Sequence, residues 1–237
     1  MIPFFPQPMI PVGRWLIPAF SVTMAAAIVA GRFIVVHRAR RLGIRHEAIA
    51  PLYLCAGLAG VAGALAGPLL HLGTGLTSFG GAIAALSVAV LFCRLRAYSY
   101  VRTLCLLDVL AFAAAFAAML GRLGCALAHE HRGILSTGWL AVRYPEGPRY
   151  DLGLIEFLFL LVLCIVFCWL DRRPRPAGFF LIAGAVAYGV FRILRAELEV
   201  EPHIMGWVFV CLAGISGACF RPDRFGRRVD QTAPQAP

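Results

Sequence analysis

Residues 104–127 read LCLLDVLAFAAAFAAMLGRLGCAL, and only Asp108 and Arg122 carry charge in this stretch. A helix needs about 20 mostly apolar residues to cross the hydrocarbon core of a bilayer. Uninterrupted runs of about 18 or more such residues are typical of membrane spans rather than of soluble domains. The stretch therefore predicts a transmembrane helix.

Similar apolar runs recur along the whole chain. Hydrophobic residues make up 60% of the sequence and charged residues 14%, whereas soluble domains have roughly 45–50% and about 25%. We therefore expect an all-α polytopic membrane protein with about seven transmembrane helices. The expected spans are residues 16–36, 48–71, 76–93, 104–127, 153–170, 178–196 and 203–220. The third run is short and begins in the glycine-bearing stretch TGLTSFGG, so six to eight spans fit the pattern.

The basic residues predict the orientation of these spans. All 22 are arginine, and four groups of them follow the first, third, fifth and seventh runs. By the positive-inside rule this side is cytoplasmic, so the N-terminus is expected outside and the C-terminus inside. The groups are Arg38, Arg40, Arg41 and Arg45; Arg94, Arg96 and Arg102; Arg172, Arg173 and Arg175; and Arg221, Arg224, Arg227 and Arg228.

The net charge of +10 would suggest a nucleic-acid partner in a soluble protein. In this chain the arginines lie in short connections between apolar runs, where they fit contact with anionic lipid headgroups. We expect no nucleic-acid partner. Residues 1–220 are expected to form a single transmembrane domain, and residues 221–237 a basic, disordered cytoplasmic tail.

A charged side chain within a span costs about 2.5 to 3.5 kcal/mol on insertion scales, so each one indicates a partner or a function. Arg122, Glu156 and Arg192 should lie at similar depth below the outer face, together with Glu130. Guanidinium groups bind phosphate in a planar, bidentate way. The four residues therefore suggest a phosphate-binding cluster, although arginines that reach towards water or pair structurally with the two glutamates explain them equally well. Asp108 is expected to cap the fourth helix or to pair with a cytoplasmic arginine.

The stretch His129, Glu130 and His131 alternates possible metal ligands. No third ligand is apparent nearby and the H-E-x-x-H spacing is absent, so we expect no metal ion. One of these histidines could instead act as a general base near neutral pH. All eight cysteines lie within or at the ends of apolar runs, and we expect them to be packing residues rather than disulfide partners.

Residues 121–133, GRLGCALAHEHRG, resemble the signature of the prolipoprotein diacylglyceryl transferases, which runs approximately G-R-x-G-N-x-x-N-x-E-x-x-G. The residues that match in identity and spacing are Gly121, Arg122, Gly124, Glu130 and Gly133. Cys125 and Ala128 stand where that signature has asparagine.

Other stretches resemble motifs of the same family and occur in the same order. TGLTSFGG resembles its glycine-rich motif and keeps Gly80 and Gly81, YDLGLIE resembles H-P-S-Q-L-Y-E and keeps Glu156, and YGVFR contains Tyr188 and Arg192. The other motif residues that differ are Phe79 and Tyr150, which replace histidines, and Ala196, which replaces a glutamate.

The resemblance implies transfer of an sn-1,2-diacylglyceryl group from phosphatidylglycerol to the lipobox cysteine of a preprolipoprotein signal peptide. Glycerol phosphate would be released, and no cofactor is needed. The implied catalytic residues are Arg122, Glu130, Glu156 and Arg192. Substrate contacts are expected from Arg122, Gly80, Gly81, Gly124, Tyr188 and His129. The enzyme would span the bacterial cytoplasmic (inner) membrane, with its site on the extracytoplasmic side and open to membrane lipid.

The replaced motif residues leave an alternative open. The chain could be a catalytically altered or inactive relative that binds phosphatidylglycerol and uses another acceptor or none. A transporter or channel is less favoured, because the sequence has no detectable inverted repeat and no run of acidic pore-lining residues.

Overall fold

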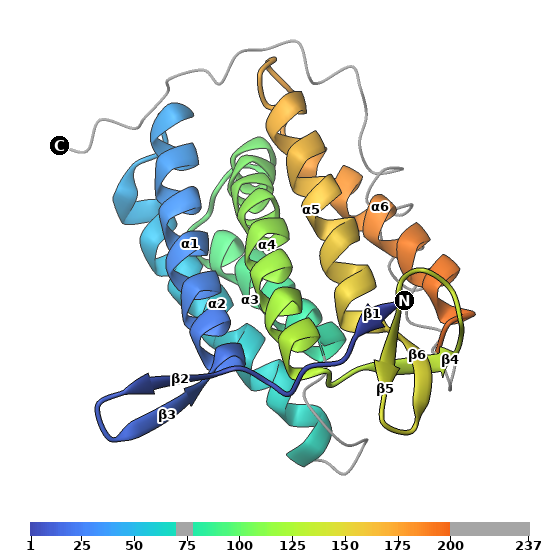
Figure 1. Ribbon diagram of the computed structural model, residues 1–237. Helices are drawn as coiled ribbons and strands as arrows, with labels where there is room; N and C mark the ends of the chain where they lie inside the picture. Colours follow the sequence, from blue (N-terminus) through green and yellow to red (C-terminus); the bar gives the residue numbers. More distant parts are fainter. Residues whose placement is uncertain (70–77, 200–237) are drawn as a thin grey trace, which may run out of the picture.

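The computed structural model describes residues 1–69 and 78–199 (Figure 1). In these residues the helices are α1 (Ala19–Arg41), α2 (His46–Leu69), α3 (Ser78–Leu95), α4 (Tyr100–Ala128), α5 (Leu152–Leu170) and α6 (Phe179–Ala196). The strands are β1 (Ile2–Pro3), β2 (Met9–Val12), β3 (Trp15–Pro18), β4 (Arg132–Leu135), β5 (Ala141–Tyr144) and β6 (Gly147–Asp151).

Five of the described helices, α1, α2, α4, α5 and α6, are long and apolar enough to cross a membrane. Helix α3 has a shorter apolar segment, Gly80–Leu95, as its short hydrophobic run predicted. Six predicted helical runs are therefore confirmed as helices, and the chain is a mostly helical, polytopic membrane protein. The predicted seventh span, 203–220, and the tail, 221–237, lie outside the described residues.

The expectation of an all-α fold was wrong for the two segments that contain strands. A four-stranded sheet has the order β1-β5-β6-β4, and β2 pairs with β3 in a separate hairpin. Strands β5 and β6 are antiparallel, with Tyr144 opposite Gly147, whose φ of +120° is accessible to glycine. The sheet lies at the end of the bundle where α4 ends and α5 begins (Figure 1). Its strands are two to five residues long and are therefore too short to cross the membrane.

Helix α4 lies at the centre of the bundle, between α1 on one side and α5 and α6 on the other, while α2 packs against α3 (Figure 1). Lipid tails are as apolar as leucine side chains, so membrane helices associate through close packing of small residues. A Cβ atom at Gly63 of α2 would overlap the carbonyl oxygen of Gly80 on α3. A Cβ atom at Gly124 of α4 would overlap Thr23 of α1.

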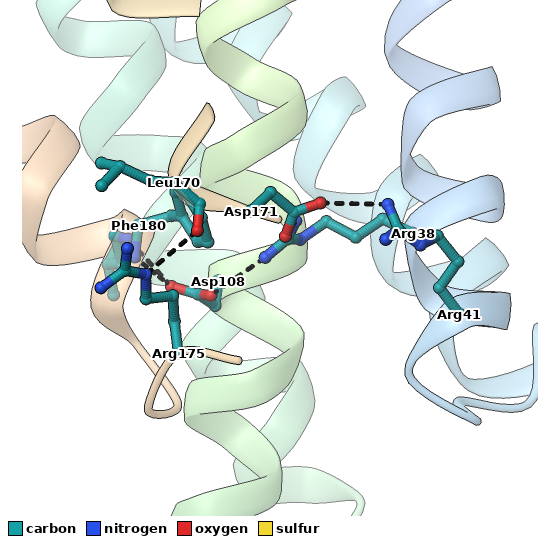
Figure 2. A network of polar contacts seen from close by, with 8 residues as sticks. Arg38, Arg41, Asp108, Leu170, Asp171, Arg175 and Phe180 are labelled. Atoms are coloured by element: carbon teal, nitrogen blue, oxygen red, sulfur yellow. Dashed lines mark hydrogen bonds and ion pairs between the residues drawn. The ribbon is translucent and has the colours of Figure 1, made fainter. Parts of the chain in front are cut away.

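Asp108, near the start of α4, joins this helix to two others (Figure 2). Its Oδ1 accepts hydrogen bonds from the backbone N–H groups of Phe180 at 2.6 Å and Leu181 at 3.0 Å. Its Oδ2 lies 3.7 Å from Arg38 Nη2. The predicted pairing with an arginine is therefore confirmed, but the helix that Asp108 caps is α6. Helix α4 is capped by Ser99, whose side chain accepts a hydrogen bond from the backbone of the first turn.

Arg38 is buried at the end of α1, where sequence reasoning placed a connecting loop. It forms an ion pair with Asp171, which follows α5 and also lies 3.2 Å from Arg41 Nη1 (Figure 2). Its guanidinium carbon lies 4.2 Å from the ring centre of Phe112 and 4.4 Å from that of Phe180. Cation–π contacts of this kind strengthen when the cation is desolvated. Charge and aromatic packing together hold α1, α4, α5 and α6 at this end.

We expect Asp108→Ala to lower the free energy of unfolding by about 3 kcal/mol, because it leaves Arg38 short of one buried partner and uncaps α6. Thermal unfolding in detergent, followed by intrinsic fluorescence, measures this change. Glu47→Ala is the matched control, since Glu47 pairs with Arg45 at the surface and such pairs contribute little. Equal stability of the two variants would contradict the role given to Asp108.

Candidate functional site

Glu156 is a carboxylate buried within the bundle, with three arginines and a tyrosine around it. Its Oε1 lies 2.8 Å from Arg122 Nε and accepts a hydrogen bond of 2.6 Å from the hydroxyl of Tyr188. Its Oε2 lies 3.1 Å from Arg195 Nη1 and 3.7 Å from Arg192 Nη1. The side chain of Glu156 is 1% exposed. We call these five residues the arginine cluster.

Three helices bring the arginine cluster together at one end of the bundle. Arg122 lies in the last two turns of α4, and Glu156 lies in the second turn of α5, which runs back alongside α4. Tyr188, Arg192 and Arg195 occupy the last turns of α6. Their spacing of four and then three residues places them on one face of that helix. Each of the three helices thus contributes charge at the same depth.

Among residues 1–69 and 78–199, the arginine cluster has three arginines and one carboxylate, Glu156, and thus more positive than negative charge. Glu199 is the second carboxylate that contacts it, through an ion pair with Arg195 and a contact of 3.6 Å between its Oε1 and Arg192 Nη2. The three arginine side chains are 5–16% exposed, so solvent screens their charge weakly. Guanidinium groups gathered in this way can bind an anion, and they are suited to phosphate.

The structure brings together Arg122, Glu156, Arg192 and Tyr188, four residues that the sequence singled out for the site. Arg195 was missed, although it is three residues after Arg192 and therefore on the same face of α6. The motif comparison directed attention to the next position, where Ala196 replaces a glutamate. The carboxylate that pairs with Arg192 at this end comes from Glu199, one turn beyond.

Glu130 has different neighbours from those we expected. Its side chain is exposed, and its carboxylate, the thiol of Cys125 and a ring nitrogen of His131 all lie within 4.8 Å of one another. Burial, and next the charge of Arg122, lower the pKa of His131. The imidazole is therefore neutral at physiological pH. Glu130 thus belongs to a thiol–imidazole–carboxylate group at the exposed edge of the arginine cluster.

His129 is buried at the end of α4, in a conformation with φ +54°. Its Nδ1 lies 2.8 Å from Asp151 Oδ2, which also accepts a 2.8 Å hydrogen bond from the hydroxyl of Tyr144. The rings of Phe4 and Phe5 pack on the imidazole at centre distances of 5.0 and 4.8 Å. These contacts give His129 a structural role between α4 and the sheet. Its role in substrate binding stays a prediction.

The glycines assigned to substrate binding lie where helices approach closely. Gly124 packs against Thr23 of α1, and a Cβ atom at Gly81 would lie 2.8 Å from the carbonyl oxygen of Gly60 on α2. Gly80 contacts α2 through its own carbonyl group. Helix packing accounts for glycine at Gly81 and Gly124. A contact of Gly80, Gly81 or Gly124 with substrate stays a prediction.

Fold and site together define an integral membrane protein with a buried cluster of three arginines around one glutamate. The family model described as prolipoprotein diacylglyceryl transferase matches residues 8–211. The chain therefore belongs to the prolipoprotein diacylglyceryl transferase family, as the sequence motifs indicated.

Two relatives carry the name phosphatidylglycerol–prolipoprotein diacylglyceryl transferase. They come from Actinobacillus pleuropneumoniae serotype 3 (strain JL03) and serotype 7 (strain AP76). Each is 30% identical to this chain over 142 residues, which cover 57% of this chain and 53% of the relative. The chain thus spans about half the length of the curated relatives it matches.

We expect Glu156→Gln to lower the free energy of unfolding by about 3 kcal/mol, because it leaves buried guanidiniums without their central counter-charge. Glu146→Gln is the matched control, since Glu146 forms an exposed pair with Arg132. Adding Arg195→Gln to Glu156→Gln should restore part of the loss by removing one surplus cation. Unfolding of the single and double variants in detergent measures this coupling, and strictly additive losses would contradict it.

Proposed function

We propose that this chain transfers an sn-1,2-diacylglyceryl group from phosphatidylglycerol to the lipobox cysteine thiol of a preprolipoprotein signal peptide. Glycerol phosphate is the second product. The observation that carries the proposal is the arginine cluster, buried in a member of this family. The relatives' names support the same donor and acceptor and favour this function over an inactive lipid-binding role.

The charge of the arginine cluster suits the chemistry of the donor. Phosphatidylglycerol has a phosphodiester with one negative charge. Breaking the bond between the diacylglyceryl carbon and the phosphate oxygen leaves glycerol phosphate, a monoester with two negative charges. Groups that bind this developing charge stabilise the transition state more than the ground state. We assign Arg122 and Arg192 to the phosphate, and Glu156 to holding both guanidiniums in position. Tyr188, which donates to Glu156, completes the binding surface.

Glu130 is the carboxylate that we assign to the acceptor. A thiol attacks carbon as the thiolate, so the lipobox cysteine must lose its proton near the donor. Glu130 is exposed and lies beside Cys125 and His131 rather than within the arginine cluster. The two substrates thus contact different residues. The donor phosphate contacts the arginine cluster, and the acceptor thiol contacts the group that contains Glu130.

We also propose the predicted topology of seven spans in a single domain of residues 1–220, with an outside N-terminus and a cytoplasmic tail of residues 221–237. The end of the bundle with Arg38, Arg41 and Asp171 carries the arginine-rich connections, which supports a cytoplasmic location. The arginine cluster lies at the opposite end of α4. It would then face the extracytoplasmic side of the bacterial inner membrane, within reach of phosphatidylglycerol and other membrane lipid.

Cysteine accessibility tests this topology. A membrane-impermeant maleimide applied to intact spheroplasts should label Glu146→Cys, which lies in an exposed turn of the sheet. It should label Arg173→Cys, in the exposed connection after α5, only once the membrane is permeabilised. The unsubstituted protein gives the background from native thiols. Labelling of Arg173→Cys alone in intact cells would reverse the orientation.

The activity is tested with detergent-purified protein, phosphatidylglycerol and a lipobox peptide, with the thioether-linked product read by mass spectrometry. We expect Arg122→Ala to abolish product. Arg122→Lys should lower the rate about 100-fold, because lysine supplies a point charge without the planar fork. Arg96→Ala is the control, since Arg96 is exposed at the other end of the bundle.

Two outcomes would count against the proposal. No product from the wild-type protein, with one of the Actinobacillus relatives active in the same assay, would contradict the transferase function. Full turnover by Arg122→Ala would leave the function standing and remove the role of the arginine cluster in phosphate binding.

A further inference from the structure

Cys125, Glu130 and His131 form a group of three different metal-ligand types beside the arginine cluster. One atom from each, the thiol sulfur, a carboxylate oxygen and an imidazole nitrogen, lies within 4.8 Å of the other two. We expected no metal ion because the sequence showed no third ligand beside His129, Glu130 and His131. The structure supplies that third ligand from the last turn of α4, and His129 points to Asp151 instead.

The backbone explains how these side chains meet. His129 adopts a left-handed conformation at the end of α4, and the N–H of Glu130 donates to the carbonyl oxygen of Cys125 at 3.3 Å. This arrangement ends the helix and turns the chain back over its last turn. The carbonyl oxygen of His131 accepts a 2.8 Å hydrogen bond from the N–H of Leu152. The two residues after the turn are therefore fixed against α4 and α5.

Contacts away from the group hold the turn in place. A non-glycine residue rarely adopts positive φ, so His129 needs support from its surroundings. Its imidazole receives that support from Asp151 and from the rings of Phe4 and Phe5. Asp151 also accepts a hydrogen bond from the backbone N–H of Leu154 and so caps α5. The position of the three candidate ligands is thus set by the fold.

We propose that Cys125, Glu130 and His131 bind one zinc ion whose fourth coordination position takes the acceptor thiol. Sulfur, nitrogen and oxygen ligands in this combination suit zinc, and three protein ligands with an open position are typical of its catalytic sites. Zinc bond lengths of about 2.0 to 2.3 Å place tetrahedral ligand atoms roughly 3 to 4 Å apart. Side-chain rotation closes the remaining gap. Glu130 is exposed and the other two are half-buried, so a peptide could reach the site from the protein surface.

This inference rests on the proposed function, in which a thiol is alkylated with phosphate as the leaving group. On binding zinc the acceptor thiol releases its proton to solvent and remains a thiolate at neutral pH. The sulfur then forms a bond to the glyceryl carbon while the bond from that carbon to the phosphate oxygen breaks. Glycerol phosphate departs with the electron pair of the broken bond. No oxidant or reductant is involved.

The surrounding charges fit this arrangement. The Cys125 thiolate and the Glu130 carboxylate balance the two charges of the zinc ion, and His131 binds as the neutral ring. The acceptor thiolate adds one negative charge, and Arg122 lies near enough to act electrostatically on both Cys125 and His131. The metal would hold the sulfur while the adjacent arginines hold the phosphate.

Metal binding is measured directly on the full-length protein purified in detergent and freed of metal with a chelator. We expect one zinc per chain by mass spectrometry of the metal. Replacement by cobalt should give the near-ultraviolet charge-transfer band of a thiolate ligand. Cys125→Asn, which restores the residue of the family signature, should weaken zinc binding at least about 100-fold and abolish the band. Glu130→Gln and His131→Ala should weaken zinc binding as well.

Cys168→Ser is the matched control, because Cys168 is an exposed thiol on α5. It should bind zinc and cobalt like the wild-type protein. Thermal unfolding of Cys125→Asn confirms that the fold is kept. The inference is overturned if the wild-type protein binds no stoichiometric zinc, or if Cys125→Asn binds it equally well.

The product assay separates this inference from the proposed function. Zinc binding that depends on Cys125, without any transfer product, supports the metal site and contradicts the transferase function. Product formed at full rate by zinc-free protein supports the transferase and overturns the metal site. Product that requires zinc and is lost in both Cys125→Asn and Arg122→Ala supports the two together.

Discussion

Helix α4 carries one buried charge near each end, and the bundle is arranged to neutralise both. Asp108 faces Arg38 and the first N–H groups of α6, while Arg122 faces Glu156 of α5. An unpaired charge in a low-dielectric interior costs several kcal/mol, and in a membrane no water is at hand to compensate. Helices α1, α5 and α6 are therefore tied to α4 by charge as well as by packing. Close contacts of small residues, such as Gly124 against Thr23, bring the backbones near enough for these pairs to form.

Among the described residues, the two ends of α4 differ in how their charges are paired. At the Asp108 end, Arg38 is enclosed by two carboxylates and two aromatic rings, so its charge is fully accounted for by the fold. At the Arg122 end, three guanidiniums share Glu156 and Glu199. Under the proposed function, the donor phosphate would bring a further negative charge to these guanidiniums.

The sequence predicted the elements that depend on hydropathy and missed those that depend on tertiary contacts. The six described helices follow from apolar length, and the meeting of Arg122, Glu156 and Arg192 follows from their depth in those helices. Asp108 was recognised as a structural residue, but its capping of α6 depends on a contact across 72 positions of the chain. The strands β4 to β6 have weak, short patterns next to much stronger helical ones. Arg195 was overlooked because the motif pointed to Ala196, although its helical spacing from Arg192 was readable in the sequence.

The positions where this chain departs from the family motifs lie outside the five residues of the arginine cluster. Arg122, Glu156, Arg192 and Tyr188, which belong to the arginine cluster, are kept. Histidines are lost at Phe79 and Tyr150, and an asparagine of the signature is replaced by Cys125. A change in the group that deprotonates the acceptor thiol would not require a change in the arginines. The negative charge that develops on the donor phosphate needs the same stabilisation in either case. The replaced asparagine lies where the left-handed turn at His129 brings Glu130 and His131 alongside it. Under the proposed metal site, cysteine at this position supplies the third ligand, so thiol activation would change while the residues of the arginine cluster are kept.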